Sequence, residues 1–201
     1  NSGCWRSEAV RVSAASIVGI LLAAGRGERF GGDKLLALLP DGECIGAAAV
    51  RHLLAAVPDV VAVVRPDDAA LAAALGANGA RIVRCVNADE GMGASLACAV
   101  QARPNAAGWL VALADMPWIG PETIARVASA IAGGAVIAAP FHRGERGHPV
   151  GFAASRYAEL AALTGDEGAK PIVAAHRDRI ARIDVDDPGI LRDIDTPGDL
   201  R

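Results

Sequence analysis

Glycines and basic side chains are concentrated between Leu22 and Lys34, directly after a short apolar run. Glycines in such a loop allow a tight turn and bring backbone N–H groups close to a ligand. Cationic side chains then supply the remaining donors to phosphate oxygens. Four glycines and three cations stand here: Gly25, Gly27, Gly31, Gly32, Arg26, Arg29 and Lys34. The segment therefore predicts a loop that binds a triphosphate.

Lys34 is one of only two lysines in the chain, against eighteen arginines. An ammonium is a compact point charge that can follow a phosphate as it moves, whereas the guanidinium is a planar fork. This favours a catalytic role for Lys34. The alternative is a chance use of lysine.

Two other phosphate motifs compete for the same loop. Gly25-x-Gly27 followed by Gly31 approximates a dinucleotide fingerprint, but its spacing differs by one residue. No acidic residue ends the next apolar run to hold a ribose, and Arg65 stands there instead. An arginine could accept a 2′-phosphate, so an NADP enzyme remains an alternative. A Walker loop is excluded because its Gly-Lys-Ser/Thr ending is missing.

Two further segments carry polar groups at the ends of apolar runs. Asp115 follows the run 109–114, where a carboxylate could hold Mg²⁺ against phosphate oxygens, or could cap the turn before Pro117. Residues 87–95 place Gly91, Gly93 and Ser95 at a predicted helix start, which suits a nucleotide. An ordinary N-capped helix is the alternative for the second segment.

These segments need a scaffold in which strands end at one edge. Strand-length apolar runs cover 17–23, 60–64, 81–86, 109–114 and 135–139, and helical patterns cover 46–57, 67–75, 94–103 and 121–131. The runs are apolar throughout, as expected for strands covered on both faces. Repeated β-α-β predicts a three-layer α/β/α, Rossmann-like fold with a mainly parallel sheet. Further on, we expect a strand at 149–153, a helix at 155–163, a last helix and a strand near 179–185.

The 201 residues suit a single domain at 17–201 after a leader at 1–16. Residues 17–103 would mainly bind nucleotide, and 104–201 would bind metal and acceptor. The net charge of −3 gives no reason to expect a nucleic-acid partner. The run 16–25 resembles a signal peptide, but a buried first strand explains it better. No uncharged run reaches the length of a membrane span. Four cysteines without zinc spacing indicate a reducing compartment, so we expect a cytoplasmic protein.

The first loop resembles the signature of nucleotidyltransferases with a GT-A-like fold, and within them the molybdenum cofactor cytidylyltransferase group. The matching pattern is Leu22-Ala23-Ala24-Gly25-x-Gly27-x-Arg29-x-Gly31-x-x-Lys34. The family spacer is usually shorter, and Phe30 stands where methionine is common. Later segments match in order: 113–117, 147–152, 163–170 and 193–197.

The resemblance implies a role for each matching position. Leu22, Ala23, Ala24, Gly25, Gly27, Gly91, Gly93 and Ser95 would bind the nucleotide, and Lys34 and Arg29 would neutralise charge on pyrophosphate. Asp115 would bind Mg²⁺, with Asp195 favoured over Asp193 as a second ligand. Capping by Asp195 or Thr196 is an equally good reading of the last segment. His148 and Asp166 would contact the acceptor.

The reaction implied is transfer of CMP from CTP to the terminal phosphate of molybdopterin. Ala24 stands where related guanylyltransferases have glycine, and its methyl group could narrow the base pocket toward a pyrimidine. A product of this kind could be passed to a molybdoenzyme or its maturation chaperone. Two alternatives remain: a transferase for a sugar or polyol phosphate, and a non-catalytic chaperone that binds nucleotide or cofactor.

Overall fold

The computed structural model describes residues 16–27 and 30–200. The leader expected at 1–16 therefore falls almost wholly outside the described residues. The first half contains β1 (Ile17–Leu22), α1 (Ile45–Ala56), β2 (Val60–Val64), α2 (Ala69–Ala77), β3 (Arg81–Arg84), α3 (Met92–Gln101) and β4 (Gly108–Leu113). The second half contains α4 (Pro121–Ala132), β5 (Ile137–His142), β6 (Glu145–Arg146), β7 (Val150–Ala153), α5 (Tyr157–Ala161), α6 (Lys170–Ala175) and β8 (Ile180–Asp184).

The strands form one eight-stranded sheet in the order β3-β2-β1-β4-β7-β5-β6, with β8 paired to β5. Pairing is parallel from β3 to β4 and between β5 and β8, whereas β7 runs antiparallel to both β4 and β5. After β3 the chain returns to the other side of β1. Ligands of open parallel sheets bind at such a reversal, beyond the carboxyl ends of the strands.

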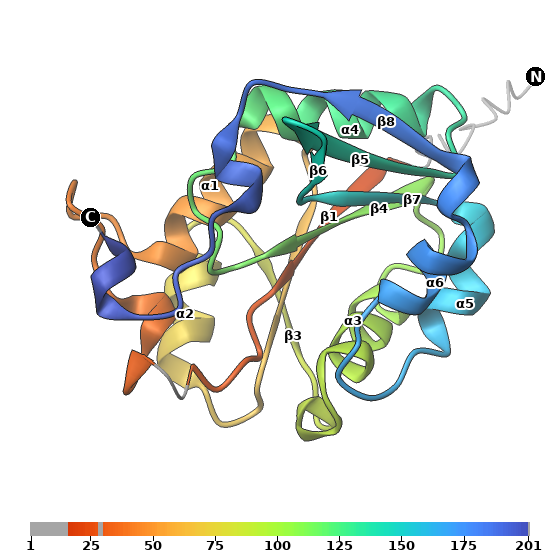
Figure 1. The fold of residues 1–201 in the computed structure, drawn as a ribbon. Helices are drawn as coiled ribbons and strands as arrows, with labels where there is room; N and C mark the ends of the chain where they lie inside the picture. The colour runs from red at the N-terminus through yellow and green to blue at the C-terminus, as the bar shows by residue number, and fades with distance from the viewer. Residues whose placement is uncertain (1–15, 28–29, 201) are drawn as a thin grey trace, which may run out of the picture.

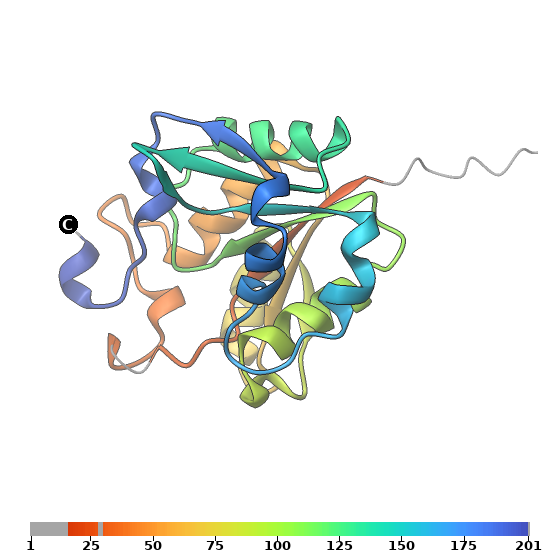
Figure 2. The same cartoon turned by 45° about the vertical axis from the view of Figure 1, so that its right-hand side comes forward.

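Helices cover both faces of the sheet, which confirms the predicted three-layer α/β/α class (Figure 1). Buried side chains from α1, α2 and α4 form one core cluster with the first face. Side chains from α3, α5 and α6 form the second cluster, in which the fully buried Trp109 and Phe152 are cross-strand partners. Figure 2 shows α5 and α6 in front of the sheet, on the same side as α3.

Small residues let α4 approach the sheet closely. A Cβ added at Gly108 or Gly151 would lie 2.7 Å from side-chain atoms of Ile131 on α4. Such a contact is too short for carbon atoms, so both strands need glycine where this helix crosses them.

The structure differs from the sequence expectations in one additional strand and in the starts of two helices. The short β6 forms a hairpin with the end of β5 that the sequence did not predict. α2 begins at Ala69 rather than at 67, because the Asp68 carboxylate accepts a hydrogen bond from Leu71 N at 3.0 Å and caps the helix. α3 begins at Met92, two residues before the predicted start.

Within residues 16–27 and 30–200, no helix is both long enough and apolar enough to cross a membrane.

Candidate active site

The carboxyl ends of β1 and β4 place the two most informative segments side by side. Leu22 and Leu113 are register partners, and Ala114 N donates to Leu22 O at 3.1 Å. The glycine-rich loop after β1 and Asp115 after β4 therefore leave the sheet at adjacent points. Parallel pairing thus brings together groups that stand about ninety positions apart in the sequence.

Lys34 is the centre of a small charged cluster at this edge. Its Nζ lies 2.8 Å from Asp115 Oδ2 and 3.8 Å from Asp195 Oδ1. Only 12% of the Lys34 side chain is exposed, so these contacts are shielded from solvent on most sides. Asp195 reaches the cluster because Ile194 N donates to Asp115 O at 2.9 Å and fixes the C-terminal segment there.

The glycine-rich loop folds tightly against Lys34. Gly27 has φ +60°, and a Cβ added there would lie 3.2 Å from Lys34 Cβ. A side chain at this position would meet both a backbone penalty and a crowded neighbour. Lys34 N donates to Gly32 O at 2.6 Å, which closes the loop just before the lysine.

Three cavities adjoin at the end of β1, and the charged cluster lies at the first two of them. The first, of about 240 Å³, is lined by Ala23, Gly25, Gly27, Lys34 and Asp115 among others. The second, of about 350 Å³, is lined by Ala24, Gly91, Ser95, Asp115 and Asp166 among others. The third, of about 380 Å³, is mostly apolar and includes His148 and Asp193. Leu22 lines all three, so the end of β1 is their common wall.

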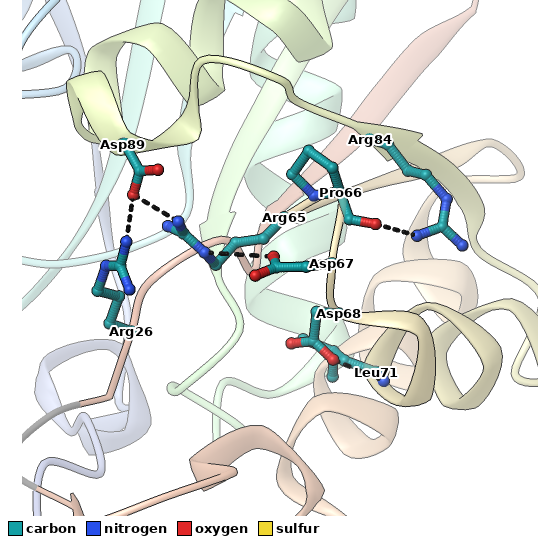
Figure 3. A network of polar contacts seen from close by, with 8 residues as sticks. All are labelled: Arg26, Arg65, Pro66, Asp67, Asp68, Leu71, Arg84 and Asp89. Carbon is teal, nitrogen blue, oxygen red and sulfur yellow. Dashed lines mark hydrogen bonds and ion pairs between the residues drawn. The ribbon is translucent and has the colours of Figure 1, made fainter.

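A carboxylate that the sequence analysis did not single out connects two basic residues near the second cavity (Figure 3). Asp89 accepts a hydrogen bond from Arg26 at 2.6 Å and another from Arg65. These hydrogen bonds, the one from Arg65 first, hold the pKa of Asp89 below its ordinary value. The arginine at the end of β2 is therefore already partnered by a carboxylate.

The N-terminus of α3 is covered by the loop expected to lie over the acceptor. Gly93 N donates to Gly165 O at 2.7 Å. A Cβ added at Gly93 would lie 2.4 Å from Thr164 O, and one at Gly91 would lie 2.2 Å from Asp166 Oδ1. Both glycines are needed for this contact. No side chain caps α3, whose N-cap is Gly91, so the ordinary capped helix weighed above does not describe it.

His148 lies in the wall of the third cavity, where its Nδ1 is buried without a hydrogen-bond partner among the described residues. Burial is the main cause that lowers the pKa of His148 below 6.5. The imidazole is therefore neutral at pH 7. Its backbone is anchored, since His148 N donates to Ile190 O at 3.1 Å.

The structure brings most of the predicted site residues to one edge of the sheet. Asp166, Gly93 and Asp193 lie in different parts of this region. Asp166 lines the second cavity with Gly91 and Ser95. Gly93 contacts the 164–165 backbone. Asp193 lines the third cavity, whereas Asp195 contacts Lys34. Arg29 lies outside the described residues.

The alternative for the last segment is a cap formed by Asp195 or Thr196. In the structure the turn after Asp195 is held by Asp199, whose Oδ2 accepts from Thr196 N at 2.7 Å and from Asp195 N at 3.1 Å. The capping carboxylate of this turn is therefore Asp199.

Cys98 is poorly suited to act as a thiolate, because burial raises the pKa of its thiol to about 11.

The donor set around Lys34 fits a magnesium ion delivered with a nucleotide. Mg²⁺ in phosphate-transfer sites is usually held by one or two carboxylates together with substrate phosphates. Asp115 and Asp195 supply two carboxylates that converge on one ammonium group. Both would be in position to bind such an ion beside the first cavity.

Comparison with known proteins agrees with this geometry. A curated relative, the purine catabolism protein PucB of Bacillus subtilis (strain 168), is 31% identical over 193 residues, 90% of this chain and 92% of its own. Nicotine blue oxidoreductase of Paenarthrobacter nicotinovorans is 29% identical over 188 residues, with the same coverage. Among solved structures, a nucleotidyl transferase from Methanothermobacter thermautotroptrophicus superposes with a TM-score of 0.78 at 26% identity, covering 92% of this chain and 94% of that one.

The family model that matches describes a MobA-like NTP transferase domain and spans residues 19–180. The matched range contains the glycine-rich loop, Lys34, Asp115 and the walls of the second cavity, and it ends before Asp193 and Asp195. The chain belongs to the MobA-like NTP transferase family.

Proposed function

We propose that this protein transfers CMP from CTP to the terminal phosphate of molybdopterin, with release of pyrophosphate. The observation that carries the proposal is the contact between Lys34 and Asp115, since both line the first cavity and Asp115 also lines the second. A family member with a cation and a carboxylate between two substrate spaces is suited to nucleotidyl transfer.

The first cavity would receive the triphosphate. Its walls supply the backbone of Gly25 and Gly27 and the side chains of Arg26 and Lys34. Lys34 would neutralise the charge that develops on the leaving pyrophosphate. Since the attacking oxygen belongs to a phosphate and is already anionic, the reaction needs no strong general base. Catalysis then depends on positioning and on charge stabilisation.

Asp115 and Asp195 would hold Mg²⁺, which would supply further charge neutralisation during the transfer. Lys34 has a second role in this arrangement. Its ammonium group contacts both carboxylates and so reduces the repulsion between them.

The second cavity would receive the base and ribose. Ala24 is 7% exposed and lines this cavity together with the buried Ser95. The Ala24 methyl group occupies space that a glycine would leave open, which supports a pyrimidine over a larger purine. This is the basis for proposing CTP as the donor.

The third cavity would receive the acceptor. Its apolar walls include Val111, Leu113 and Phe152, and its polar residues include His148, Arg146 and Lys170. A flat heterocycle with a phosphate arm suits an apolar space with a few polar groups. A neutral His148 can donate or accept a hydrogen bond there, as a pterin would require.

Two observations favour an NADP-dependent oxidoreductase as another candidate: Arg65 directly follows β2, and a relative is named as an oxidoreductase. The guanidinium of Arg65 is engaged by Asp89, so a 2′-phosphate would have to displace a carboxylate. The contact between Arg65 and Asp89 therefore weighs against an NADP-dependent oxidoreductase.

The decisive experiment supplies the full chain with Mg²⁺, one acceptor (molybdopterin, a sugar phosphate or a polyol phosphate) and one of CTP, GTP, UTP or ATP, and measures pyrophosphate. Binding of CTP and oxidation of NADPH are measured in parallel. We expect release with CTP above all, and its loss in Asp115→Asn. CTP binding without pyrophosphate release would favour a chaperone. Oxidation of NADPH without pyrophosphate release would favour the oxidoreductase. Release only with a sugar or polyol phosphate would reassign the acceptor.

A further inference from the structure

A further cavity adjoins the acceptor cavity. This outer cavity, of about 560 Å³, shares Arg146, Lys170 and Val173 with the acceptor cavity. The two shared cations therefore stand at the neck between the two spaces. The outer cavity is not needed for any step derived above.

Four cations line the outer cavity, and no carboxylate does: Arg146, Lys170, Arg177 and Arg182. All four side chains are exposed to solvent. In the part of the chain that the structure describes, Arg146, Lys170 and Arg177 form no ion pair with a carboxylate. Arg182 is paired with Asp184 at 2.7 Å, and Glu167 lies in the neighbouring acceptor cavity.

Strand register explains why these cations gather. Arg146 of β6 is the cross-strand partner of Phe141 on β5, so their side chains share a face of the sheet. Arg182 of β8 pairs with Ala139, two residues before Phe141, and therefore points to the same face. Its guanidinium stacks over the Phe141 ring at 4.3 Å from the centroid.

The opposite wall is formed by the segment that covers this face. Lys170 begins α6, and Arg177 begins the short 3-10 helix that follows it. Val173 of α6 is buried in the core cluster of the same sheet face as Phe141, which fixes the distance between wall and sheet. The cavity is therefore built by packing and is not a chance meeting of surface side chains.

We propose that the outer cavity binds a second anionic group of the acceptor, an oxyanion remote from the phosphate that attacks the nucleotide. This proposal rests on the proposed function, because it takes the adjoining cavity to be the acceptor site. Several cations that have no protein carboxylate as partner repel one another, and an anion relieves that repulsion. A concave cavity of this size suits a small oxyanion better than a flat protein surface.

The first test measures binding of tungstate, a small oxyanion, by equilibrium dialysis against the full chain. All proteins carry Lys34→Ala, which weakens anion binding in the triphosphate cavity. We expect Arg177→Ala to weaken tungstate binding roughly tenfold, the value of one lost charge-assisted contact. Arg179→Ala is the matched control, since it removes another exposed arginine two residues away that does not line the cavity. Equal affinities in the two variants would overturn the proposal.

The second test separates the acceptor's own oxyanion from a free one, in chains with Lys34 intact. Arg177→Ala should raise the KM for the molybdenum-loaded cofactor, whose metal–oxo group is the second oxyanion, roughly tenfold and leave the KM for CTP unchanged. Weaker tungstate binding with an unchanged acceptor KM would mean a site for a free oxyanion and would overturn the proposal. If Arg177→Ala changed only the transfer of product to an acidic protein, the proposal would also be overturned, in favour of a protein interface. If the wild type released no pyrophosphate, the proposed function would fail while the tungstate result would stand.

Discussion

Lys34 Nζ and Asp115 Oδ2 are 2.8 Å apart, although the residues belong to loops that follow different strands. This contact joins the glycine-rich loop to the segment that follows the carboxyl end of β4. It also sets the charge balance of the site, because the same ammonium lies 3.8 Å from Asp195 Oδ1. The ammonium group of Lys34 thus contacts two carboxylates.

Lys34→Ala is expected to lower turnover far more than it lowers stability. Loss of a positioned cation at a phosphoryl group typically costs on the order of 100-fold to 1,000-fold in kcat. The pair is partly exposed, with 25% of the Asp115 side chain accessible. We therefore expect the free energy of unfolding to fall by only about 1 kcal/mol. Pyrophosphate release and urea unfolding measure the two effects.

Lys34→Arg is the matched control, because it keeps the charge and changes its shape. It should restore the stability and recover only part of the turnover, since the guanidinium fork is larger than an ammonium. Full activity in Lys34→Ala would contradict the catalytic role of this lysine.

Ala24→Gly is expected to shift base preference toward purines. The ratio of kcat/KM for GTP to that for CTP should rise by about tenfold, the usual scale for one methyl group in a pocket. Ala23→Gly is the control, because Ala23 lines the first cavity and is 2% exposed. The prediction fails if both variants change the base ratio equally.

Gly93→Ala is expected to displace the 164–166 loop from α3. The new methyl group would lie 2.4 Å from Thr164 O, where a Cβ cannot be accommodated. We expect a loss of about 1–3 kcal/mol in the free energy of unfolding. Gly25→Ala meets no atom within 4 Å and should leave stability nearly unchanged. Limited proteolysis would show whether the loop opens, and an unchanged cleavage pattern in Gly93→Ala would rule this account out.

His148 should make the protein less stable in mild acid. Burial lowers its pKa below 6.5 in the folded state, while the unfolded chain takes up a proton at the ordinary value. The free energy of unfolding is then greatest above pH 6.5 and falls as the pH drops from 6.5 toward the lowered pKa. His52, whose pKa burial also lowers, adds a term of the same sign.

Urea unfolding between pH 5 and 8 would test this dependence, with His148→Gln beside the wild type. The variant should retain a shallower pH dependence from His52. Identical slopes for the two proteins would show that His148 is not buried as described.

The placement of the glycine-rich loop beside Asp115 could be predicted from the sequence because the information for it is local. Glycines, cations and apolar runs of strand length lie in continuous segments, and parallel pairing brings their ends together. Pairing of Leu22 with Leu113 then places Asp115 beside the loop, as the βαβ pattern requires. The family resemblance added Asp195, which the sequence physics alone could not choose over Asp193.

The acceptor half depends on contacts that no local pattern specifies. The antiparallel placement of β7 between β4 and β5 depends on how the whole sheet assembles. The strand β6 is only two residues long and has no sequence pattern of its own. The role of Asp89 could not be predicted, because an exposed carboxylate in a loop has no distinctive spacing. Its hydrogen bonds with Arg26 and Arg65 are visible only in the structure. Arg146 and Arg182 become neighbours through Phe141, on a third strand.

Leu22 lines the cavities proposed for triphosphate, base and acceptor alike. One side chain at the end of β1 thus sets the shape of every substrate space at once. Replacement of Leu22 would disturb the selection of nucleotide and of acceptor together. Specificity for one substrate therefore cannot change at this position without a change in specificity for the other. Relatives that acquire new acceptors should therefore vary at the outer walls and keep this leucine or a residue of the same volume.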